Sequence, residues 1–251
     1  MQAIVLCGGK GERLRPLTAS RPKPLVEVDG RPIIEHILSI FTSQGVRDFI
    51  LCLGYLGPRF EEHFLNRKTS LIERDEASVY VETDGVRIRL VDTGQSTMTG
   101  GRLGRVARYV TEPTVFVSYG DVVANVNLLE LKRCHEAGQR VSTLTVTKLE
   151  PRFGLVTVEA GRAVEFHEKD PAAQPWINAG FMIVDRSLLE QLTDDNCVFE
   201  ADVLPRLAST GQMTAYEHHG CWYCMDTPGD VSRLNRIAHD CGADSYPWLA
   251  A

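Results

Sequence analysis

A glycine-rich, basic segment near the N-terminus carries residue types that bind anions. Gly8, Gly9 and Gly11 follow an apolar run, Ala3 to Cys7, which predicts a buried parallel strand. Backbone amides at glycines can approach an anion closely. Four cations follow within eleven positions: Arg13, Arg15, Arg21 and Lys23. Because ligands of open α/β sheets bind beyond the carboxyl ends of the strands, this position predicts a phosphate-binding loop. The alternative interpretation is a solvated basic loop.

The two common nucleotide fingerprints are missing from this segment. No Gly-x-x-x-x-Gly-Lys-Ser/Thr run occurs in the sequence, so a P-loop is disfavoured. The dinucleotide pattern needs a glycine three positions after Gly11, and that position is Leu14. Kinase-like P-loop chemistry and hydride transfer are therefore both disfavoured.

Charged residues elsewhere in the chain carry little signal by themselves. Asp121 follows an apolar run, Thr114 to Tyr119. An isolated aspartate in this place more often caps a turn than binds a metal. Glu168 and Lys169, taken alone, form an exposed charged pair.

Alternating apolar and amphipathic segments must position these residues. Six segments are expected to be strands: 3–7, 49–53, 114–119, 141–148, 177–184 and 213–217. Six are expected to be helices: 32–45, 58–65, 101–110, 126–137, 199–209 and 230–241. Two β-hairpins are expected, at 78–91 about Asp84-Gly85 and at 154–167 about Gly161. This order predicts an α/β fold with a doubly wound, mixed but mainly parallel sheet and β-rich insertions.

Composition narrows the class of protein. The chain has 251 residues, 43% of them hydrophobic, which is enough for one compact domain with a substantial core. Its net charge is -6 with no long basic block, so nucleic acid is not expected as a partner. Seven irregularly spaced cysteines predict reduced thiols. Neither a signal peptide nor a membrane-spanning apolar run is recognisable, so we expect a cytoplasmic protein.

The basic segment resembles the signature of a known family. Gly8-Gly-Lys-Gly-Glu-Arg-Leu-Arg-Pro-Leu-Thr18, followed by Arg21-Pro-Lys-Pro-Leu25, is similar to the signature of the sugar-phosphate nucleotidyltransferases. Asp48 to Tyr55 and Leu90 to Leu103 resemble the glucose-1-phosphate cytidylyltransferase branch. The match to the family signature continues through Gly30 to Ile33, and shorter matches fall in the order of the branch: Arg152 to Gly154, Glu168-Lys169, Ile177-Asn178, Gly180-Phe181 and Met225 to Thr227. The resemblance covers nearly the whole chain and implies a Rossmann-like nucleotidyltransferase fold.

The resemblance also implies a reaction and its catalytic groups. CMP passes from CTP to a sugar-1-phosphate, with glucose-1-phosphate the expected acceptor, and pyrophosphate leaves. Asp121 and Asp226 match the family's metal-binding carboxylates, and carboxylate oxygens suit Mg²⁺. Arg13 is placed to hold the departing phosphates, and Lys23 to contact the α-phosphate and the sugar phosphate. A homo-oligomer is expected by the same analogy.

The binding residues implied by the resemblance fall into two sets. A nucleotide-binding half spans about 1–125 and a sugar-phosphate-binding half about 126–251, within a single domain of residues 1–251. The nucleotide set is Leu6, Gly8, Gly9, Gly11, Arg13, Lys23, Thr99, Gly100, Arg102 and Gly120. The sugar-phosphate set is Glu168, Lys169, Asn178 and Gly180.

Four positions depart from the pattern of the branch. Val122 replaces a glycine, Asn125 an aspartate, Ala179 a glycine and Cys224 a proline. We expect these changes to surround the sugar and metal sites, which leaves the acceptor open.

Three alternative interpretations remain at this stage. One is a zinc site, suggested by His218, His219, Cys221, Cys224, His239 and Cys241. Another is a non-catalytic regulatory subunit with the same fold, which should lack Lys23, Asp121 or Asp226. The third is the same reaction with UTP, dTTP or GTP, against which the stretch Val91 to Arg102 argues.

Overall fold

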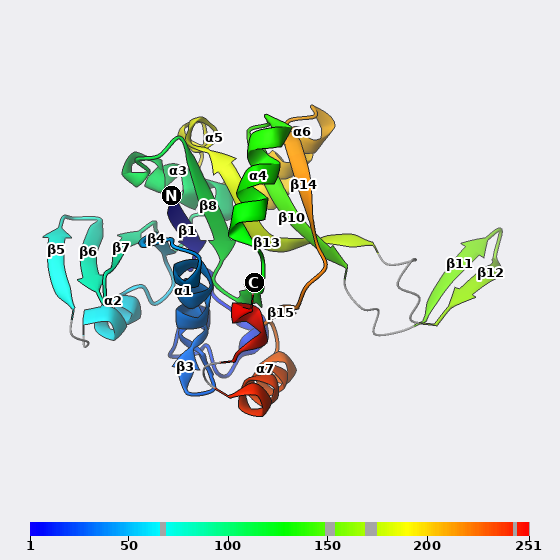
Figure 1. Ribbon diagram of the computed structural model, residues 1–251, viewed down its shortest axis with the longest axis horizontal. Helices are drawn as coiled ribbons and strands as arrows, with labels where there is room; N and C mark the ends of the chain where they lie inside the picture. The colour runs from blue at the N-terminus through cyan, green and yellow to red at the C-terminus, as the bar shows by residue number, and fades with distance from the viewer. Residues whose placement is uncertain (66–68, 149–153, 169–174, 243–244, 251) are drawn as a thin grey trace.

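The computed structural model describes residues 1–65, 69–148, 154–168, 175–242 and 245–250. Its centre is a nine-stranded sheet with the order β14-β10-β13-β8-β1-β4-β7-β6-β5 (Figure 1). The strands are β1 Gln2–Leu6, β4 Asp48–Leu53, β5 Ser70–Arg74, β6 Ser78–Thr83, β7 Val86–Asp92, β8 Thr114–Tyr119, β10 Ser142–Lys148, β13 Trp176–Asp185 and β14 Met213–His218. From β8 through β1 and β4 to β7 all neighbours run parallel, whereas β13 is antiparallel to both of its neighbours. The expected α/β fold with a mixed sheet is confirmed.

Helices cover both faces of this sheet. The α-helices are α1 Ile33–Ser43, α2 Pro58–Leu65, α3 Thr99–Val106, α4 Leu128–Gly138, α5 Arg186–Glu190, α6 Leu204–Ser209 and α7 Pro228–Cys241. Ala3 and Val5 belong to one core cluster together with residues of α1, α2, α4 and α7. Ile4 and Leu6 belong to the opposite cluster, with residues of α3, α5 and α6. Two buried faces explain why β1 is apolar at almost every position.

The two predicted hairpins are confirmed. β6 and β7 pair about Asp84 and Gly85, whose φ angles of 50° and 72° suit a type I′ turn. β11 (Leu155–Glu159) pairs with β12 (Arg162–His167) about Ala160 and Gly161, and this hairpin stands apart from the nine-stranded sheet.

Some elements differ from the prediction. Edge strand β5 was not expected, because all five of its residues are exposed and give it no apolar alternation. The helix expected at 199–209 starts as a π-helix, Phe199–Val203, before α6. The amide of Leu204 donates to the carbonyl of Phe199, five residues earlier, and the next residue, Pro205, has no amide hydrogen for an i→i−4 bond. Within the described residues, no helix is both long and apolar enough to cross a membrane.

Candidate functional site

Two short strands bring Asp121 and Asp226 together. β9 (Val122–Ala124) begins directly after Asp121, and β15 (Trp222–Cys224) ends just before Met225 and Asp226. The strands pair antiparallel, and the amide of Met225 donates to the carbonyl of Asp121 at 2.9 Å. The aspartate from the end of β8 and the aspartate from the C-terminal part of the chain therefore share one site.

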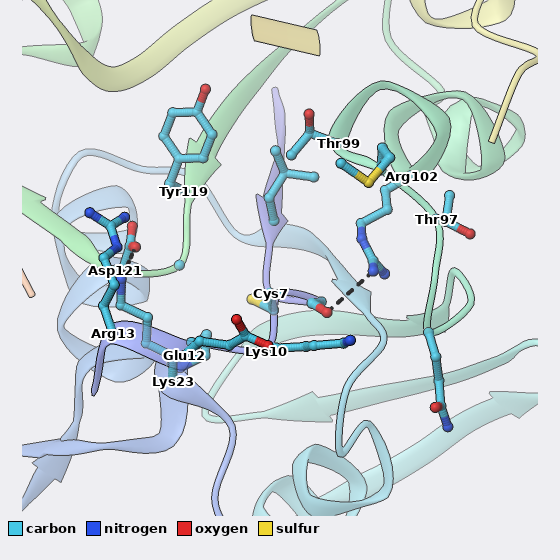
Figure 2. Close-up of a pocket in the computed structure, with 18 of the residues that line it drawn as sticks. Cys7, Lys10, Glu12, Arg13, Lys23, Thr97, Thr99, Arg102, Tyr119 and Asp121 are labelled. Carbon is cyan, nitrogen blue, oxygen red and sulfur yellow. Dashed lines mark hydrogen bonds and ion pairs between the residues drawn. The ribbon is translucent and has the colours of Figure 1, made fainter. Parts of the chain in front are cut away.

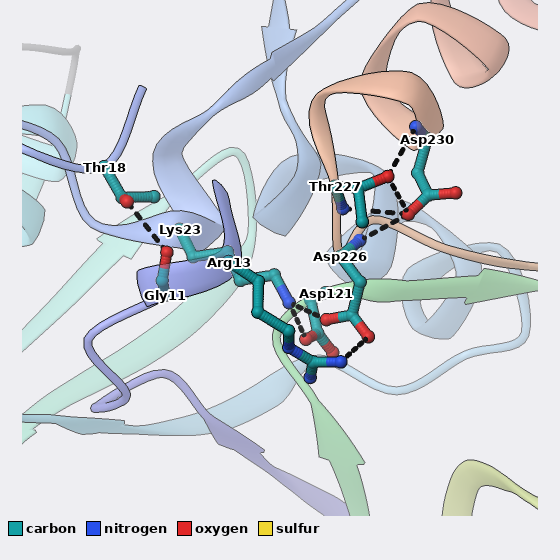
Figure 3. A network of polar contacts seen from close by, with 8 residues as sticks. All are labelled: Gly11, Arg13, Thr18, Lys23, Asp121, Asp226, Thr227 and Asp230. Carbon is teal, nitrogen blue, oxygen red and sulfur yellow. Dashed lines mark hydrogen bonds and ion pairs between the residues drawn. The ribbon is translucent and has the colours of Figure 1, made fainter. Parts of the chain in front are cut away.

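Lys23 connects the two carboxylates. It begins the 3₁₀-helix Lys23–Leu25. Its Nζ lies 2.5 Å from Asp121 Oδ2 and 2.5 Å from Asp226 Oδ1 (Figure 3). Arg13, from the 3₁₀-helix Glu12–Leu14, places Nη1 3.0 Å from Asp226 Oδ2. All four residues that were expected to be catalytic therefore converge, two cations against two anions.

The charges of this cluster stabilise each other. Burial alone would raise the pKa of Asp226, but the bond from Lys23 and the positive charges of Lys23 and Arg13 lower it below its ordinary value. Burial alone would lower the pKa of Lys23, but the Asp121 charge and the bonds to both carboxylates raise it. Lys23 and Asp226 consequently both remain charged at neutral pH.

The start of α7 fixes the backbone of Asp226. Thr227 is the N-cap of α7 and forms a capping box with Asp230. The amide of Asp226 donates to Asp230 Oδ2 at 3.1 Å (Figure 3). The helix cap therefore also orients the backbone from which the Asp226 carboxylate projects.

A cavity of about 830 Å³ opens beside this cluster, beyond the carboxyl ends of β1 and β8. A volume in this range suits a nucleotide-sized ligand. Its lining holds most of the residues expected to bind nucleotide: Leu6, Gly8, Gly9, Gly11, Arg13, Lys23, Thr99, Arg102 and Gly120. Tyr119 and Thr99 lie across the cavity from Lys10, Glu12 and Lys23 (Figure 2).

Arg102 forms the buried wall of the cavity. It is 5% exposed and donates to the carbonyls of Leu53 and Gly8 and to Thr93 Oγ1, at 2.7, 3.2 and 2.7 Å. Burial lowers the pKa of Arg102. A Cβ added to Gly8 would lie 2.1 Å from the Nη1 of Arg102, so a glycine is required there for the close approach. The basic loop and the Leu90–Leu103 segment thus build one wall.

Gly100, in the first turn of α3, does not take the position that was expected of it. Thr99 lines the cavity, whereas Gly100 is absent from the lining formed by the described residues. The amide of Gly100 donates to the carbonyl of Cys197 at 2.9 Å, and an added Cβ would meet the Cys197 sulfur at 2.5 Å. Gly100 therefore permits close packing of α3 against the chain at Cys197 and does not face the cavity. This corrects its placement in the nucleotide set.

The expected sugar-phosphate residues are only partly brought to the cavity. The Nδ2 of Asn178 on β13 donates to the hydroxyl of Tyr119, a lining residue, at 3.3 Å. Gly180 has a φ of 82°, and a Cβ there would lie 2.8 Å from the Tyr119 ring. Glu168 lies beside Gly154 at the base of the β11–β12 hairpin, away from the cavity lining, so the structure does not bring it to the other candidates. Lys169 lies outside the described residues.

The four departures do not all surround the site. Cys224 lies beside the two aspartates. Val122 and Ala179 are buried, with Val122 packed near Gly180. Asn125 instead packs beside Gly220 and donates to the carbonyl of Ala250 at 3.1 Å, so its expected position near the sugar or metal was wrong.

The residues of the zinc alternative do not converge. His218 Nε2 bonds the carbonyl of Cys221, and His219 pairs with Glu217. In the described part of the chain, the metal-ligand cluster is Asp121, Cys224 and Asp226, whose ligand atoms lie within 4.8 Å of one another. Two carboxylates suit a hard divalent cation that completes its shell with water and phosphate oxygens, and the sulfur is a poor ligand for Mg²⁺.

Comparison with known proteins decides the family. The model of the family described as "Nucleotidyl transferase" matches residues 2–240. The chain belongs to this family. This nucleotidyl transferase is 38% identical over 245 residues to the glucose-1-phosphate cytidylyltransferase of Salmonella typhi, covering 94% of this chain and 95% of that one. It is 33% identical to the mannose-1-phosphate guanylyltransferase of Mycobacterium tuberculosis, over 93% of this chain and 63% of that one.

The fold of this nucleotidyl transferase also matches a solved structure. HddC from Yersinia pseudotuberculosis, complexed with GMP-PN, superposes with a TM-score of 0.72 over 94% of this chain and 98% of that one. The sequence identity is 19%, so this likeness establishes the fold alone.

Sequence reasoning missed several residues of the site, among them Tyr119 and Glu200. Tyr119 lines the cavity, and Glu200 bonds both Tyr119 and Thr99. A tyrosine at the end of an apolar strand and a single glutamate in an expected helix carry no sequence signal for a site.

Proposed function

We propose that this nucleotidyl transferase transfers CMP from CTP to a sugar-1-phosphate, giving a CDP-sugar and pyrophosphate. Glucose-1-phosphate is the acceptor we expect. The observation that carries the proposal is the bridge from Lys23 to Asp121 and Asp226 beside a nucleotide-sized cavity. The identity with the Salmonella typhi cytidylyltransferase supports CTP and glucose-1-phosphate as substrates.

The proposed step is a direct displacement. A phosphate oxygen of the sugar-1-phosphate forms a bond to the α-phosphorus of CTP, and the bond from that phosphorus to the β-phosphate oxygen breaks. The electron pair leaves with pyrophosphate, so no covalent enzyme intermediate is needed. Catalysis then rests on positioning and charge neutralisation.

Lys23 and Arg13 supply the positive charge for this displacement. Lys23 holds the α-phosphate and the acceptor phosphate together against their mutual repulsion, and Arg13 neutralises the departing phosphates. We propose Mg²⁺ as the metal, with Asp121 and Asp226 as its protein ligands; when bound, it offsets charge on the phosphates. A regulatory subunit would not need these four residues to converge.

Base recognition is proposed for the wall formed by the basic loop and Arg102. The carbonyl of Gly8 already accepts hydrogen bonds from the amide of Tyr55 at 3.1 Å and from Arg102. Recognition by Gly8 therefore falls to its amide, and Gly9 contributes its main-chain groups. Leu6, Gly11, Thr99 and Gly120 complete the proposed nucleotide set.

Acceptor recognition is proposed for Asn178, with Gly180 supporting Tyr119 from behind. Glu168 and Lys169 stay in the acceptor set as proposals from the family resemblance. We also propose that the chain acts as a single domain, with halves of about 1–125 and 126–251, and that it works as a cytoplasmic homo-oligomer.

The acceptor is tested by a panel of sugar-1-phosphates. The protein is incubated with CTP, Mg²⁺ and each sugar-1-phosphate in turn, and pyrophosphate release is followed. We expect the highest kcat/KM with glucose-1-phosphate. A higher value with another sugar would reassign the acceptor, and no release with any sugar would reject the proposed reaction.

A further inference from the structure

Glu200 joins the two sides of the cavity from behind its wall. It lies in the π-helix Phe199–Val203, a rare conformation that concentrates at functional sites. The hydroxyl of Tyr119 donates to Oε1 at 2.5 Å, and the hydroxyl of Thr99 donates to Oε2 at 2.6 Å. Both donors line the cavity, so one carboxylate holds a residue of β8 and a residue of α3 at once.

The charge of Glu200 sets the direction of a chain of hydrogen bonds. An ionised carboxylate only accepts, so the single proton of Tyr119 points toward Glu200. The phenol oxygen must then accept from Asn178, whose Nδ2 lies 3.3 Å away. Asn178 Oδ1 in turn accepts from the amide of Gly180 at 2.8 Å. The side-chain amide of Asn178 is therefore held in one orientation, with a known donor and acceptor left for a ligand.

The other end of Glu200 fixes the nucleotide side. Thr99 begins α3, the helix that carries Arg102, and its hydroxyl also accepts from the amide of Phe199 at 2.9 Å. The preceding residues of the Glu200 segment cap α3, because the carbonyl of Cys197 accepts from the amides of Gly100 at 2.9 Å and Gly101 at 3.3 Å. The same segment therefore supports both substrate walls.

We propose that Glu200 is a positioning residue that orients Asn178 for the acceptor through Tyr119, and holds the α3 wall through Thr99. The inference rests on the proposed function, because it takes Asn178 as an acceptor-binding residue. Glu200 acts through its two neighbours, and no contact with substrate is assigned to it.

The test compares Glu200→Gln with Tyr119→Phe and the double variant. Glutamine keeps the size of the side chain but offers one acceptor and one donor, so it cannot accept from both hydroxyls. We expect the KM for glucose-1-phosphate to rise about tenfold in each single variant, the loss of one charge-assisted hydrogen bond. Because both changes break one chain, the double variant should show no further rise. Thr99→Val should raise the KM for CTP instead.

Glu190→Gln is the matched control, since Glu190 is an exposed glutamate paired with Arg186. It should leave both KM values unchanged. The inference is overturned by an unchanged sugar KM in Glu200→Gln, or by additive effects in the double variant. If Glu200→Gln does not fold, Tyr119→Phe decides alone, because it removes only one hydroxyl.

Wild-type turnover separates this inference from the proposed function. Absence of pyrophosphate release from CTP and glucose-1-phosphate rejects the proposed function. The same variants are then titrated with CDP-glucose by calorimetry. Weaker binding in both single variants, without additivity, supports the role of Glu200; equal binding, or no binding to wild type, overturns it.

Discussion

Lys23 Nζ lies 2.5 Å from Asp226 Oδ1, and the same ammonium contacts Asp121. The lysine thus holds the two carboxylate oxygens that a divalent cation would also use. Lys23 is only 13% exposed, so its charge is poorly screened by water. Under the proposed function, this arrangement would make Lys23 both a phosphate-binding group and a competitor of the metal.

Lys23→Met should therefore separate two effects. We expect turnover to fall about 10²–10³-fold, the usual loss for one charge-stabilising group. Affinity for Mn²⁺, titrated by electron paramagnetic resonance, should rise because the competing ammonium is gone. Lys132→Met, which removes an exposed lysine paired with Glu136, is the control. Near-normal turnover in Lys23→Met would refute the assigned role.

The pH dependence of the unfolding free energy should reflect protonation of the Asp226 carboxylate. Its pKa lies below the ordinary value, so the unfolded chain takes up this proton first as pH falls. The stabilisation is complete above the unfolded pKa of about 3.9, and is lost as pH falls through the folded pKa. Asp226→Asn should flatten this part of the curve of unfolding free energy against pH, measured by urea denaturation. If the slope of unfolding free energy against pH at acidic pH were unchanged, that would contradict the ion pair.

Arg102→Met should destabilise the protein by about 1–3 kcal/mol, because it removes the buried hydrogen bonds from the guanidinium to the carbonyls of Leu53 and Gly8 and to Thr93 Oγ1. It should also raise the KM for CTP, because the Gly8 loop loses its support. Arg105→Met removes an exposed pair with Asp195 and should cost no more than about 1 kcal/mol. Denaturation curves and CTP kinetics check both variants, and equal losses would show that burial of Arg102 is unimportant.

Thr227→Ala tests whether the N-terminal cap of α7 affects turnover as well as stability. Removing the N-cap of α7 is expected to lower stability by about 1 kcal/mol, and to lower turnover because Asp230, which holds the amide of Asp226, loses its hydrogen bonds with the Thr227 hydroxyl. Asn127→Ala removes the equivalent cap of α4, away from the site. The control should lose similar stability and keep its turnover. Equal turnover in the two variants would show that the α7 cap does not influence catalysis.

The sequence predicted the parts of the site that depend on local patterns. The apolar run before Gly8 and the cations after it placed a loop at the end of β1, where the structure has it. The meeting of Asp121 and Asp226 could not be derived from pattern. It depends on β9 and β15, each three residues long, which pair across a long separation in sequence.

Residues that act through long-range contacts were beyond sequence reasoning. Glu200 meets Tyr119 and Thr99 only because the 3D fold packs the π-helix against α3. Gly100 was placed in the cavity because its neighbours resemble a base-binding loop. Its real constraint, close packing against Cys197, comes from another part of the chain.

The central claim is tested most directly by one competition reaction. Glucose-1-phosphate and Mg²⁺ are incubated with the protein and an equimolar mixture of CTP, UTP, GTP and dTTP, and the nucleotide-sugars are identified by mass spectrometry. CDP-glucose should be the main product, with an equal amount of pyrophosphate. A different main nucleotide-sugar, or none at all, would contradict cytidylyl transfer.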